Sequence, residues 1–366
     1  MKILFLGDYS NLHACLATEL RRRGHTVTVV SDGGRYLDTE CDINITREPG
    51  LRGSLSYLYR LFSVMPGLKG YDVVQLINPQ FLDLRPGRNK YFLDMLRRNN
   101  GSLFCTLAGN DNAFVEACVS GDMFRFSEFM TGRTPTPYNR GGVAGSLWTT
   151  EEMHAYREYV YSHLDGAMSV LPEYDMASRP LLGDRLAFTN IPVDLSTLPF
   201  SELTTDGPLR LFVGIRRESA LQKGTGVLLE AAQAVAGRHP GEVEVDCVSN
   251  VSLKEYLERM RGAHVVLDQL YSYSPATNAL QAMAMGRVAA SGAQPEYYSY
   301  IGEETRPVVE LSPLLDTEET LESLLEERAL LPFMARQGRD IVERHNDLKV
   351  VATKFEDHWK KTLERK

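Results

Sequence analysis

Basic residues follow a predicted buried strand in the second half of the chain and come just before a predicted helix. Arg216 and Arg217 lie directly after that strand, and Lys223 and Gly224 open the helix. Cations beside the first turn of a helix bind phosphate oxygens well, and a glycine lets the backbone approach a phosphate closely. The pattern therefore predicts a diphosphate site at Arg216, Lys223 and Gly224. The alternative is that the two arginines are exposed loop charges.

A second polar turn leads into a short helix of small residues that is closed by Gly286. Pro275, Thr277 and Asn278 form the turn, and either Thr277 or Asn278 would serve as the N-cap. The N–H groups of the first helical turn have no intrahelical partners, so they could hold an anion. The alternative is a well-capped and tightly packed helix that binds nothing.

Together these two segments resemble the nucleotide-sugar-binding half of GT-B glycosyltransferases. The similarity is to the large retaining group (family 4, group 1-like), which carries a Lys-Gly element and a Glu-x7-Glu element. Residues 280–286 (LQAMAMG) are similar to the "LEAMAxG" helix of that group, and Pro295 and Glu296 stand where it often has a Pro-Glu pair. The resemblance runs through the whole chain, because the opening turn, His13 and residues 24–27 (GHTV) resemble the group's first β-α-β unit.

The resemblance implies a role for each matching residue. Arg216, Lys223 and the helix-start amides of Asn278 and Ala279 would bind the donor diphosphate, and Gln281 would contact the nucleotide ribose. A contact between Glu296 and donor groups is also implied. The resulting set of donor-binding residues is Gly7, Arg216, Lys223, Gly224, Tyr273, Thr277, Asn278, Ala279, Gln281 and Glu296.

The Glu-x7-Glu pair itself is replaced in this chain. Gln281 stands at the position of the second glutamate, and Tyr273 stands at the position of the first. An amide can still hydrogen-bond a ribose hydroxyl, whereas a tyrosine cannot supply a carboxylate near the donor sugar. The chain therefore resembles a divergent branch found among bacterial polysaccharide-assembly enzymes, and loss of catalysis is an alternative.

The N-terminal half offers residues for the other side of a ligand cleft. Gly7 follows the first predicted strand, where it would let the backbone approach the donor or the acceptor; the alternative is a simple turn with Asn11 as the N-cap. His13 and Asp111 are the candidate general bases if the reaction inverts configuration. The alternatives are a partly exposed helix residue for His13 and a helix cap for Asp111.

The segments around these residues alternate between strand and helix patterns. Residues 2–6 are apolar after Lys2, as in a strand buried on both faces. Leu12, Leu16 and Leu20 then repeat with helical spacing, and a further strand spans residues 25–31. This β-α-β unit is the predicted opening of a parallel α/β sheet.

Two such series, joined by a proline-bearing segment, predict two domains. We expect an α/β protein with two Rossmann-like domains facing each other across a cleft (GT-B), and a C-terminal helix that packs back on the N-terminal domain. Its apolar stripe, which includes Val351, Phe355 and Trp359, needs a hydrophobic partner. Residues 131–150, rich in Gly, Thr and Pro, are predicted to form a loop or lid. The predicted boundaries are 1–189 for the acceptor-side domain, 190–208 for the linker, 209–345 for the nucleotide-sugar domain and 346–366 for the helix.

Composition and missing motifs argue against several classes. The formal net charge of −8, without a long Lys/Arg block, argues against a nucleic-acid partner. The sequence contains no HExxH or Asp-x-Asp motif, which would indicate a metal site, and no GxGxxG fingerprint, which would indicate a nicotinamide cofactor. We therefore expect no metal and no cofactor; the nucleotide-diphosphate sugar is a substrate. Scattered cysteines and the lack of a signal-peptide pattern or a long apolar run predict a cytoplasmic protein. Peripheral contact with the inner membrane surface is left open.

The predicted function is that of a glycosyltransferase of the hexosyltransferase type. It would move a sugar from a nucleotide-diphosphate donor to a hydroxyl of a glycan or lipid-linked acceptor, in bacterial surface polysaccharide or glycoconjugate assembly. Arg216, Lys223 and helix amides would stabilise the charge on the departing diphosphate. The alternatives are a catalytically inactive nucleotide-sugar-binding module with the same fold and a nucleotide-sugar epimerase on the same architecture.

Overall fold

The computed structural model describes residues 1–33 and 40–365 and divides into two compact units. Residues 34–39, in the predicted N-terminal domain, and residue 366, in the predicted terminal helix, lie outside the described residues. Unit 1 comprises Met1–Glu116, Ser146–Pro192 and Leu348–Lys366, and unit 2 comprises Ala117–Gly145 and Val193–Asp347.

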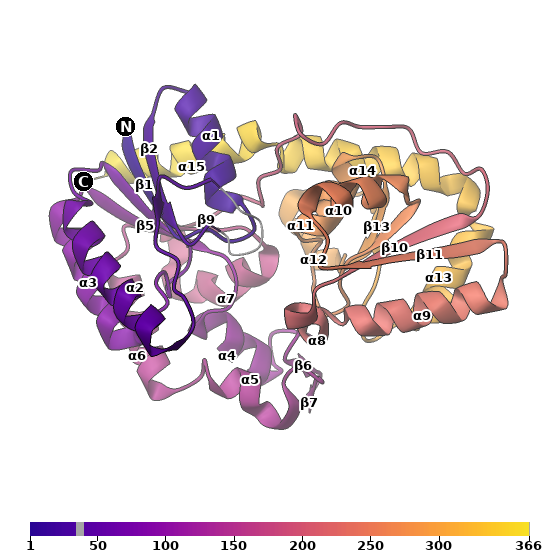
Figure 1. The fold of residues 1–366 in the computed structure, drawn as a ribbon, viewed down its shortest axis with the longest axis horizontal. Coiled ribbons are helices and arrows are strands. Elements are labelled where there is room, and N and C mark those ends of the chain that lie inside the picture. Colours follow the sequence, from indigo (N-terminus) through magenta and orange to yellow (C-terminus); the bar gives the residue numbers. More distant parts are fainter. Residues whose placement is uncertain (34–39, 366) are drawn as a thin grey trace. The chain divides into compact units, whose positions relative to one another are not determined.

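Unit 1 is built on a parallel sheet with the strand order of a Rossmann-like domain. Among the described residues the order is β3-β2-β1-β4-β5-β8-β9, and each neighbouring pair is parallel. The chain order reverses between β1 and β4, which makes their carboxyl ends a switch point of the kind where open α/β sheets bind ligands. The strands are β1 (Lys2–Leu6), β2 (Thr26–Ser31), β3 (Ile43–Asn44), β4 (Val73–Leu76), β5 (Ser102–Leu107), β8 (Gly166–Ser169) and β9 (Leu186–Phe188), shown in Figure 1.

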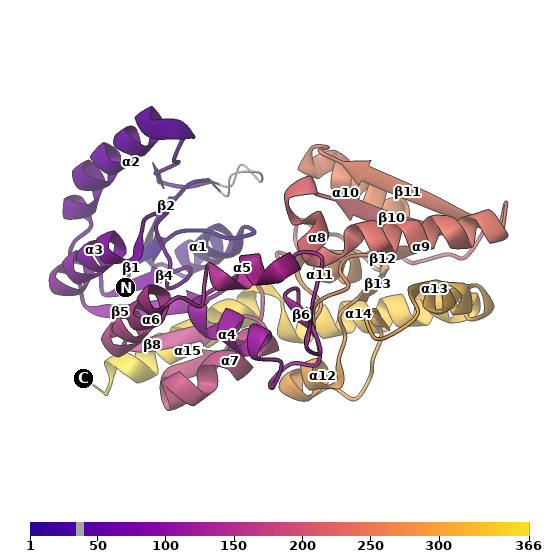
Figure 2. The same ribbon diagram turned by 90° about the horizontal axis from the view of Figure 1, so that it is seen from below.

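Amphipathic helices pack against this sheet and against one another. Helix α1 packs beside α15 and β2, and α3 packs beside α6. The apolar strand residues and the inner faces of these helices form one buried core, as the sequence pattern predicts. The helices are α1 (Leu12–Arg22), α2 (Gly50–Val64), α3 (Pro86–Asn99), α4 (Asn112–Ser120), α6 (Glu151–His163), α7 (Pro172–Leu182) and α15 (Leu348–Leu363) (Figures 1 and 2).

The C-terminal helix α15 packs on unit 1, which confirms the prediction from its apolar stripe. Trp359 is fully buried, and its indole N–H donates a hydrogen bond to Gln75 Oε1 in β4 at 2.9 Å. Glu356 accepts hydrogen bonds from Arg23 Nη1 at 2.5 Å and from His25 Nε2 at 2.7 Å. These contacts join the last helix of the chain to its first β-α-β unit.

Unit 2 contains a second parallel sheet, with the order β11-β10-β12-β13-β14 among the described residues. Its switch point lies between β10 and β12, because β11 pairs with the opposite edge of β10. The strands are β10 (Leu209–Ile215), β11 (Val243–Ser249), β12 (Val265–Leu267), β13 (Val288–Ser291) and β14 (Val309–Glu310). The helices are α8 (Ala220–Lys223), α9 (Thr225–Arg238), α10 (Leu253–Gly262), α11 (Thr277–Ala284), α12 (Pro295–Ile301), α13 (Thr317–Glu326) and α14 (Leu331–His345).

Residues 117–145 belong to unit 2, although the predicted boundaries place them in the N-terminal domain. The stretch predicted as a loop or lid, residues 131–150, contains short elements. They are the hairpin of β6 (Met130–Thr131) and β7 (Thr134–Pro135), a 3₁₀ turn over Arg140–Gly142 and α5 (Val143–Ser146). The chain thus runs out of α4 into unit 2 and returns through α5.

Most of the predicted linker also belongs to unit 2, whose second segment begins at Val193. Leu203 is buried, and Arg287 Nη2 donates to the Ser201 carbonyl oxygen at 2.7 Å. Gly286, two residues after the end of α11, permits this close packing, since a Cβ atom there would lie 2.5 Å from the same carbonyl oxygen. Residues 193–208 are therefore part of the second folded unit and not a free connection.

No helix within the described ranges combines the length and the apolar character that crossing a bilayer requires.

Candidate functional site

A buried carboxylate lies at the switch point of unit 2. Asp268 follows β12, and its side chain has no exposed surface. Its Oδ1 accepts a hydrogen bond from Lys223 Nζ at 3.0 Å and from Asn278 Nδ2 at 3.3 Å, while Ser291 Oγ lies 3.4 Å from Oδ2. Asp268 thereby brings together Lys223 at the end of α8 and Asn278 at the start of α11, two of the residues that the sequence predicts to bind a diphosphate.

Lys223 keeps the capacity to bind an anion in this arrangement. Its side chain is 30% exposed, whereas its partner carboxylate is enclosed. An ammonium group carries three donors and no acceptor, so the bond to Asp268 leaves donors for a phosphate. The buried partner thus fixes the direction of the lysine side chain without consuming all of its hydrogen bonds.

Gly224 shapes the start of α9 beside Lys223. It has φ +72°, and a Cβ atom there would lie 2.9 Å from both Leu270 Cβ and the Tyr271 ring. The Leu270 N–H donates to the Lys223 carbonyl oxygen at 2.8 Å, which fastens the turn to the loop after β12. Only glycine fits this left-handed, closely packed position at the positive end of the α9 dipole.

The next residue, Thr225, is the first of α9. Its Oγ1 is buried and has no hydrogen-bond partner among the described residues. A buried hydroxyl without a partner is uncommon in folded proteins and needs an explanation. Here it lies in the first turn of a helix, where N–H groups also lack intrahelical partners.

Arg216 directly follows β10 and so lies at the same edge of the sheet. Its side chain is 51% exposed, and its Nε lies 3.5 Å from Glu218 Oε2. A phosphate at this guanidinium would compete with Glu218, which is itself exposed. The structure therefore places Arg216 near the predicted site but pairs it with a neighbouring acid.

The start of α11 differs in detail from the prediction. Ala276 occupies the N-cap position and supplies no side-chain cap, so neither Thr277 nor Asn278 is the N-cap. Asn278 is the second residue of the helix, where its amide donates to Asp268, and Ala279 is buried in the same turn. Gln281 is half-buried and forms no side-chain hydrogen bond with another described residue, which leaves its amide available for a ribose hydroxyl.

Tyr273 is engaged by the segment that crosses from unit 1. Its hydroxyl accepts a hydrogen bond from the Arg125 backbone N–H at 2.6 Å. The Phe124 and Phe126 rings lie 5.4 Å and 4.9 Å from the Tyr273 ring, centroid to centroid. The prediction that Tyr273 contacts the donor is wrong, because its ring is buried against Phe124 and Phe126 and its hydroxyl is hydrogen-bonded to Arg125 within unit 2.

Glu296, at the start of α12, is held by the same segment. Arg125 Nη1 and Nη2 lie 2.9 Å and 3.1 Å from the two Glu296 oxygens, and Nη2 also donates to Gln294 Oε1 at 2.7 Å. Sequence reasoning missed Arg125. The alternation of large aromatic residues on both sides of a cation, Phe124-Arg125-Phe126, is the signal that could have indicated a packed extended segment.

In unit 1, His13 lies in the core and not at a substrate surface. Its ring stacks on Phe5 at 4.5 Å and has no exposed area. Nδ1 donates to the Gly7 carbonyl oxygen at 2.7 Å, so Nε2 accepts from Thr106 Oγ1 at 3.0 Å, and Thr106 in turn accepts from Gln75 Nε2 at 2.9 Å. Burial lowers the pKa of His13 to about 3. The prediction of a general base is therefore wrong, because both ring nitrogens are occupied and out of reach of a substrate.

Asp111 is the helix cap that the sequence offered as its alternative role. Its Oδ1 accepts the Phe114 backbone N–H at 2.8 Å, and Oδ2 accepts the Tyr161 hydroxyl at 3.1 Å. Burial raises the pKa of this carboxyl, and the two hydrogen bonds oppose that rise. At α1, Asn11 occupies the N-cap position, as the alternative interpretation of this turn predicts, but its side chain makes no capping hydrogen bond; Asp8 Oδ1 accepts the His13 backbone N–H at 2.8 Å instead.

Close packing against the segment after β4 explains why residue 7 is a glycine. It has φ +84°, and a Cβ atom there would lie 2.3 Å from Ile77 Cγ2 in the segment after β4. The residue therefore lies at the switch point of unit 1, where β1 and β4 end side by side. Its role toward a donor or an acceptor stays a prediction.

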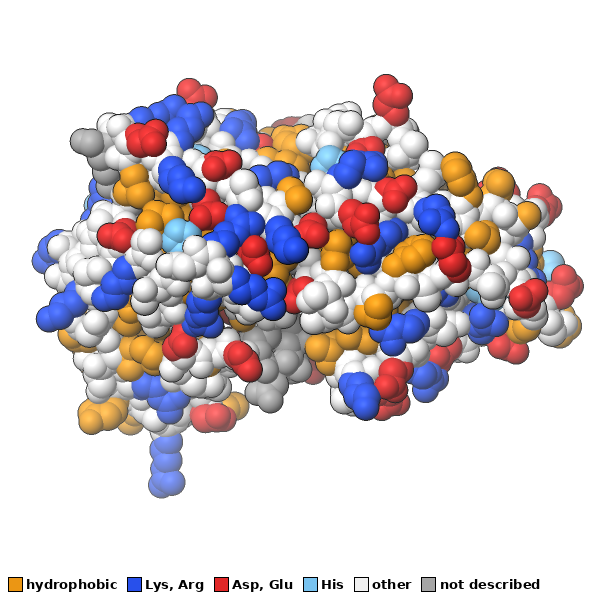
Figure 3. Space-filling model, turned by 90° about the horizontal axis from the view of Figure 1, so that it is seen from above, with side chains coloured by type: hydrophobic (Ala, Val, Ile, Leu, Met, Phe, Trp, Pro, Cys, Tyr) orange, Lys and Arg blue, Asp and Glu red, His pale blue; other side chains and the backbone are white. Residues whose placement is uncertain are grey.

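The described residues contain no group of three or more His, Cys, Asp or Glu side chains placed to hold a metal ion. Basic and acidic side chains are intermingled over the face shown in Figure 3.

Comparisons with known proteins support the fold. No protein-family model matches the sequence, and no curated protein matches it. Among solved structures, the chain is similar to a sucrose-phosphate synthase from Thermosynechococcus elongatus, with a TM-score of 0.63, 14% identity and full coverage of both chains. A glycosyltransferase from Rickettsia africae gives a TM-score of 0.59 and 13% identity, over 100% of this chain and 99% of that one. The catalytic domain of starch synthase IV from Arabidopsis thaliana gives 0.56 and 10%, also over 100% and 99%. Together with the two parallel sheets and the returning terminal helix, these similarities show that the chain has the GT-B fold.

Proposed function

We propose that this protein is a glycosyltransferase that moves a hexosyl-type group from a nucleotide-diphosphate sugar to an acceptor hydroxyl. One observation carries the proposal: Lys223 and Asn278 converge on the buried carboxylate of Asp268 at the switch point of the unit 2 sheet. The fold supports it, since the similar starch synthase structure is described as bound to ADP and acarbose. In this proposal the donor diphosphate binds between Lys223 and the first turns of α9 and α11.

The main catalytic contribution is electrostatic. As the bond between the sugar and the diphosphate breaks, negative charge builds on the diphosphate. Lys223, already oriented by Asp268, and the N–H groups at the helix starts stabilise that charge without having to reorganise. The hydroxyl of Thr225 is a further donor in the same turn, and Gln281 binds the ribose through its amide.

The protein supplies no base from His13 or Asp111 in this proposal, because both are buried and hydrogen-bonded. Glu296 remains a donor-side residue whose charge is balanced by Arg125.

The proposed setting is the assembly of a bacterial surface polysaccharide or glycoconjugate, on a glycan or lipid-linked acceptor. One structural neighbour, with a TM-score of 0.53 and 11% identity over 98% of this chain and 99% of that one, is a lipopolysaccharide outer core galactosyltransferase. We place the reaction in the cytoplasm, at the inner face of the membrane, and assign it no cofactor and no nucleic-acid partner.

The proposal is tested by a thermal-shift screen of the whole protein against nucleoside diphosphates, nucleoside monophosphates and inorganic sulfate. A ligand that binds only the folded state stabilises it by about 2.7 kcal/mol when its concentration is 100 times Kd. This stabilisation raises the melting temperature. We expect nucleoside diphosphates to raise it more than monophosphates at equal concentration. If no diphosphate raises it more than sulfate does, the diphosphate site is absent.

The second candidate is a nucleotide-sugar-binding module without transfer activity, and the engagement of Tyr273 and Glu296 by Arg125 favours it. Such a protein would bind the diphosphate but release neither free sugar nor glycosylated product. Measuring donor hydrolysis and transfer over a panel of acceptors separates the two. No observation in the structure favours the epimerase alternative.

A further inference from the structure

Helix α2 of unit 1 presents a row of large apolar side chains to solvent. They recur every three or four residues and therefore share one face of the helix. Their exposed fractions lie between 54% and 85%, which is far above what a packed helix face shows. We call this row the α2 stripe; it consists of Leu51, Leu55, Tyr59 and Phe62.

The opposite face of α2 is firmly anchored, so the exposure is not a sign of a loose helix. Tyr57 and Leu61 are buried in the core of unit 1, and the Tyr57 hydroxyl accepts the Asp83 backbone N–H at 3.1 Å. Phe62 also contacts α3, where the Tyr91 ring lies 6.0 Å away and is itself 48% exposed. The α2 stripe therefore continues onto α3 as a fixed apolar surface.

The charges beside the stripe are basic. From Pro49 to Tyr71 the only charged residues are Arg52, Arg60 and Lys69, and no carboxylate interrupts them. A helix that carries Leu, Tyr and Phe on one face and arginines at its edge has the character of an interfacial helix. The protein as a whole has a net charge of −8, so this local excess of positive charge is against its overall balance.

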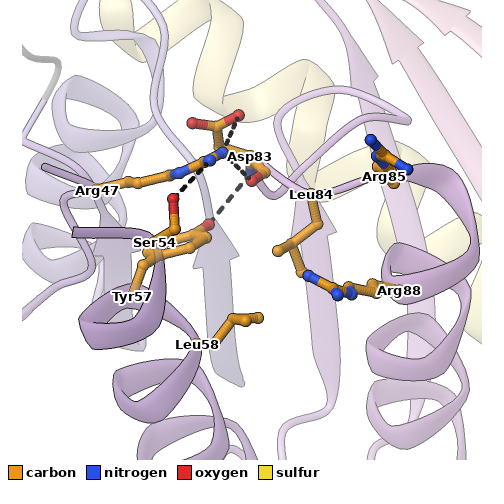
Figure 4. Close-up of a pocket in the computed structure, with 8 residues that line it drawn as sticks. All are labelled: Arg47, Ser54, Tyr57, Leu58, Asp83, Leu84, Arg85 and Arg88. Atoms are coloured by element: carbon orange, nitrogen blue, oxygen red, sulfur yellow. Dashed lines mark hydrogen bonds and ion pairs between the residues drawn. The ribbon is translucent and has the colours of Figure 1, made fainter. Parts of the chain in front are cut away.

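A cavity of about 400 Å³ lies between α2 and the segment that leads into α3, and arginines line it (Figure 4). Figure 4 shows Arg47 extending between Ser54 and Asp83, to which it is hydrogen-bonded and ion-paired. Arg85 and Arg88, at the start of α3, line the same cavity and form no ion pair with any residue in 1–33 or 40–365. The cavity thus contains more guanidinium groups than carboxylates, as a site for a phosphate does.

These features together select one kind of partner. The stripe lies on the outside of a helix and is convex, so it is suited to entering a soft apolar layer and not to receiving a peptide in a groove. A second copy of the chain would bring arginines against arginines, because a two-fold interface pairs a surface with itself. A bilayer with anionic lipids can bind both the apolar stripe and the arginines. Its acyl chains surround the apolar side chains, and its lipid phosphates pair with the guanidinium groups.

We propose that the α2 stripe and the arginine-lined cavity beside it dock this protein on an anionic phospholipid bilayer, with the stripe entering the interface and a lipid phosphate occupying the cavity. This docking surface is separate from the donor site of unit 2 and does not depend on glycosyl transfer. The lipid chemistry required is a phosphate-bearing headgroup in a membrane, not a free phosphate.

The test is flotation of the full-length protein with vesicles of phosphatidylcholine alone and of phosphatidylcholine mixed with phosphatidylglycerol. We expect binding to the mixed vesicles, little binding to the neutral ones, and no competition from inorganic phosphate at the same phosphate concentration. Leu55→Ser should reduce the partition coefficient about tenfold, because a leucine side chain would no longer be buried. Arg85→Gln with Arg88→Gln should reduce it roughly 25-fold, at about fivefold for each basic residue near an anionic surface.

Matched controls separate docking from folding and from general charge. Phe333→Ser removes an equally exposed apolar residue from α14 of unit 2, and Arg22→Gln removes an exposed arginine from α1 of unit 1. Neither should change vesicle binding, and all variants should keep the wild-type melting temperature, since every side chain changed is exposed. Nucleoside-diphosphate binding should be unaffected throughout, so this test and the test of the donor site can fail separately.

Three outcomes would overturn the proposal. One is absence of vesicle binding by the wild type, and another is binding that Leu55→Ser and the arginine pair leave unchanged. The third is a stable dimer, seen by sedimentation in the absence of lipid and dissociated by Leu55→Ser, because the stripe would then be a protein interface.

Discussion

The hydroxyl of Tyr273 accepts a hydrogen bond from the backbone N–H of Arg125 at 2.6 Å, across a separation of 148 residues along the chain. The Arg125 side chain then binds both oxygens of Glu296. Two positions that the resemblance assigns to donor contacts are thus tied to a segment inserted from the N-terminal half. The positions of these two side chains therefore depend on that segment as well as on the motif residues.

Replacing Arg125 tests whether its ion pair with Glu296 affects nucleoside-diphosphate binding. Arg125→Ala would leave the Glu296 carboxylate without its counter-charge on the donor side of unit 2. We expect nucleoside-diphosphate affinity to fall about fivefold, because an unbalanced carboxylate repels the ligand, while stability falls by only about 1 kcal/mol for a pair this exposed. Arg259→Ala, which breaks the similarly exposed pair with Asp246, is the control and should leave affinity unchanged. Equal effects of the two variants on affinity would refute this role of Arg125.

Gly224→Ala should damage the proposed donor site through the backbone. The residue has φ +72°, where an alanine costs about 1–2 kcal/mol, and its Cβ atom would lie 2.9 Å from Leu270 Cβ. Displacement of the turn moves Lys223, so donor binding should weaken together with stability in thermal and calorimetric measurements. The control is Gly226→Ala, two residues later in α9, where a Cβ atom has no neighbour within 4 Å. That variant should be neutral or stabilising; an equal loss in both would mean that the conformation of Gly224 is not the cause.

Trp359→Phe should destabilise unit 1 by about 1–3 kcal/mol. The change keeps most of the apolar volume of the side chain but removes the N–H that satisfies Gln75 Oε1, and a buried acceptor without a partner costs about this much. Chemical unfolding monitored by far-ultraviolet circular dichroism measures the difference. Trp148→Phe, at the other tryptophan of the chain, is only half-buried and should cost less. A Trp359 variant as stable as the wild type would show that the hydrogen bond between α15 and β4 contributes nothing.

The burial of His13 predicts an acid-sensitive fold. The pKa of His13 is lowered to about 3 in the folded protein, against 6.5 for the ordinary side chain. Between these values the unfolded chain binds a proton that the folded chain excludes, so stability must fall as pH decreases from about 6.5, at roughly 1.4 kcal/mol per unit. His13→Gln should flatten the slope of unfolding free energy between pH 6 and pH 4. Leu16→Ala, which destabilises the same helix but keeps His13, should retain the wild-type slope; a slope unchanged in His13→Gln contradicts the burial of a neutral ring.

The parts of the fold that sequence predicts are those with one clear periodicity. The run predicted as a strand, Lys2–Leu6, is apolar from Ile3 onward and is followed by a glycine, and it is β1 with the same bounds. The spacing of Val351, Phe355 and Trp359 likewise predicts α15 and its need for a partner. Helix α2 is not among the predicted elements although its sequence is amphipathic, and the structure shows that one of its apolar rows has no partner to pack on.

The residues of the candidate site likewise fall into those that local sequence predicts and those that depend on the tertiary fold. Lys223 and Gly224 are predictable because a strand, a glycine and a helix follow one another locally. The states of His13 and Tyr273 are not, since they depend on Thr106 and on Arg125, whose proximity only the tertiary fold creates. Local sequence indicates which residues lie at a sheet edge, but not which of them the rest of the chain covers.

The most direct test of the account is calorimetric titration of the wild type and of Lys223→Ala with the nucleoside diphosphate that gives the largest thermal shift. A charge-assisted hydrogen bond contributes about 1.5–3 kcal/mol, so the variant should bind about 10- to 100-fold more weakly. Lys361→Ala, an exposed lysine of α15, should bind as the wild type does. Equal affinity of Lys223→Ala and the wild type would show that the diphosphate does not bind at the switch point of unit 2.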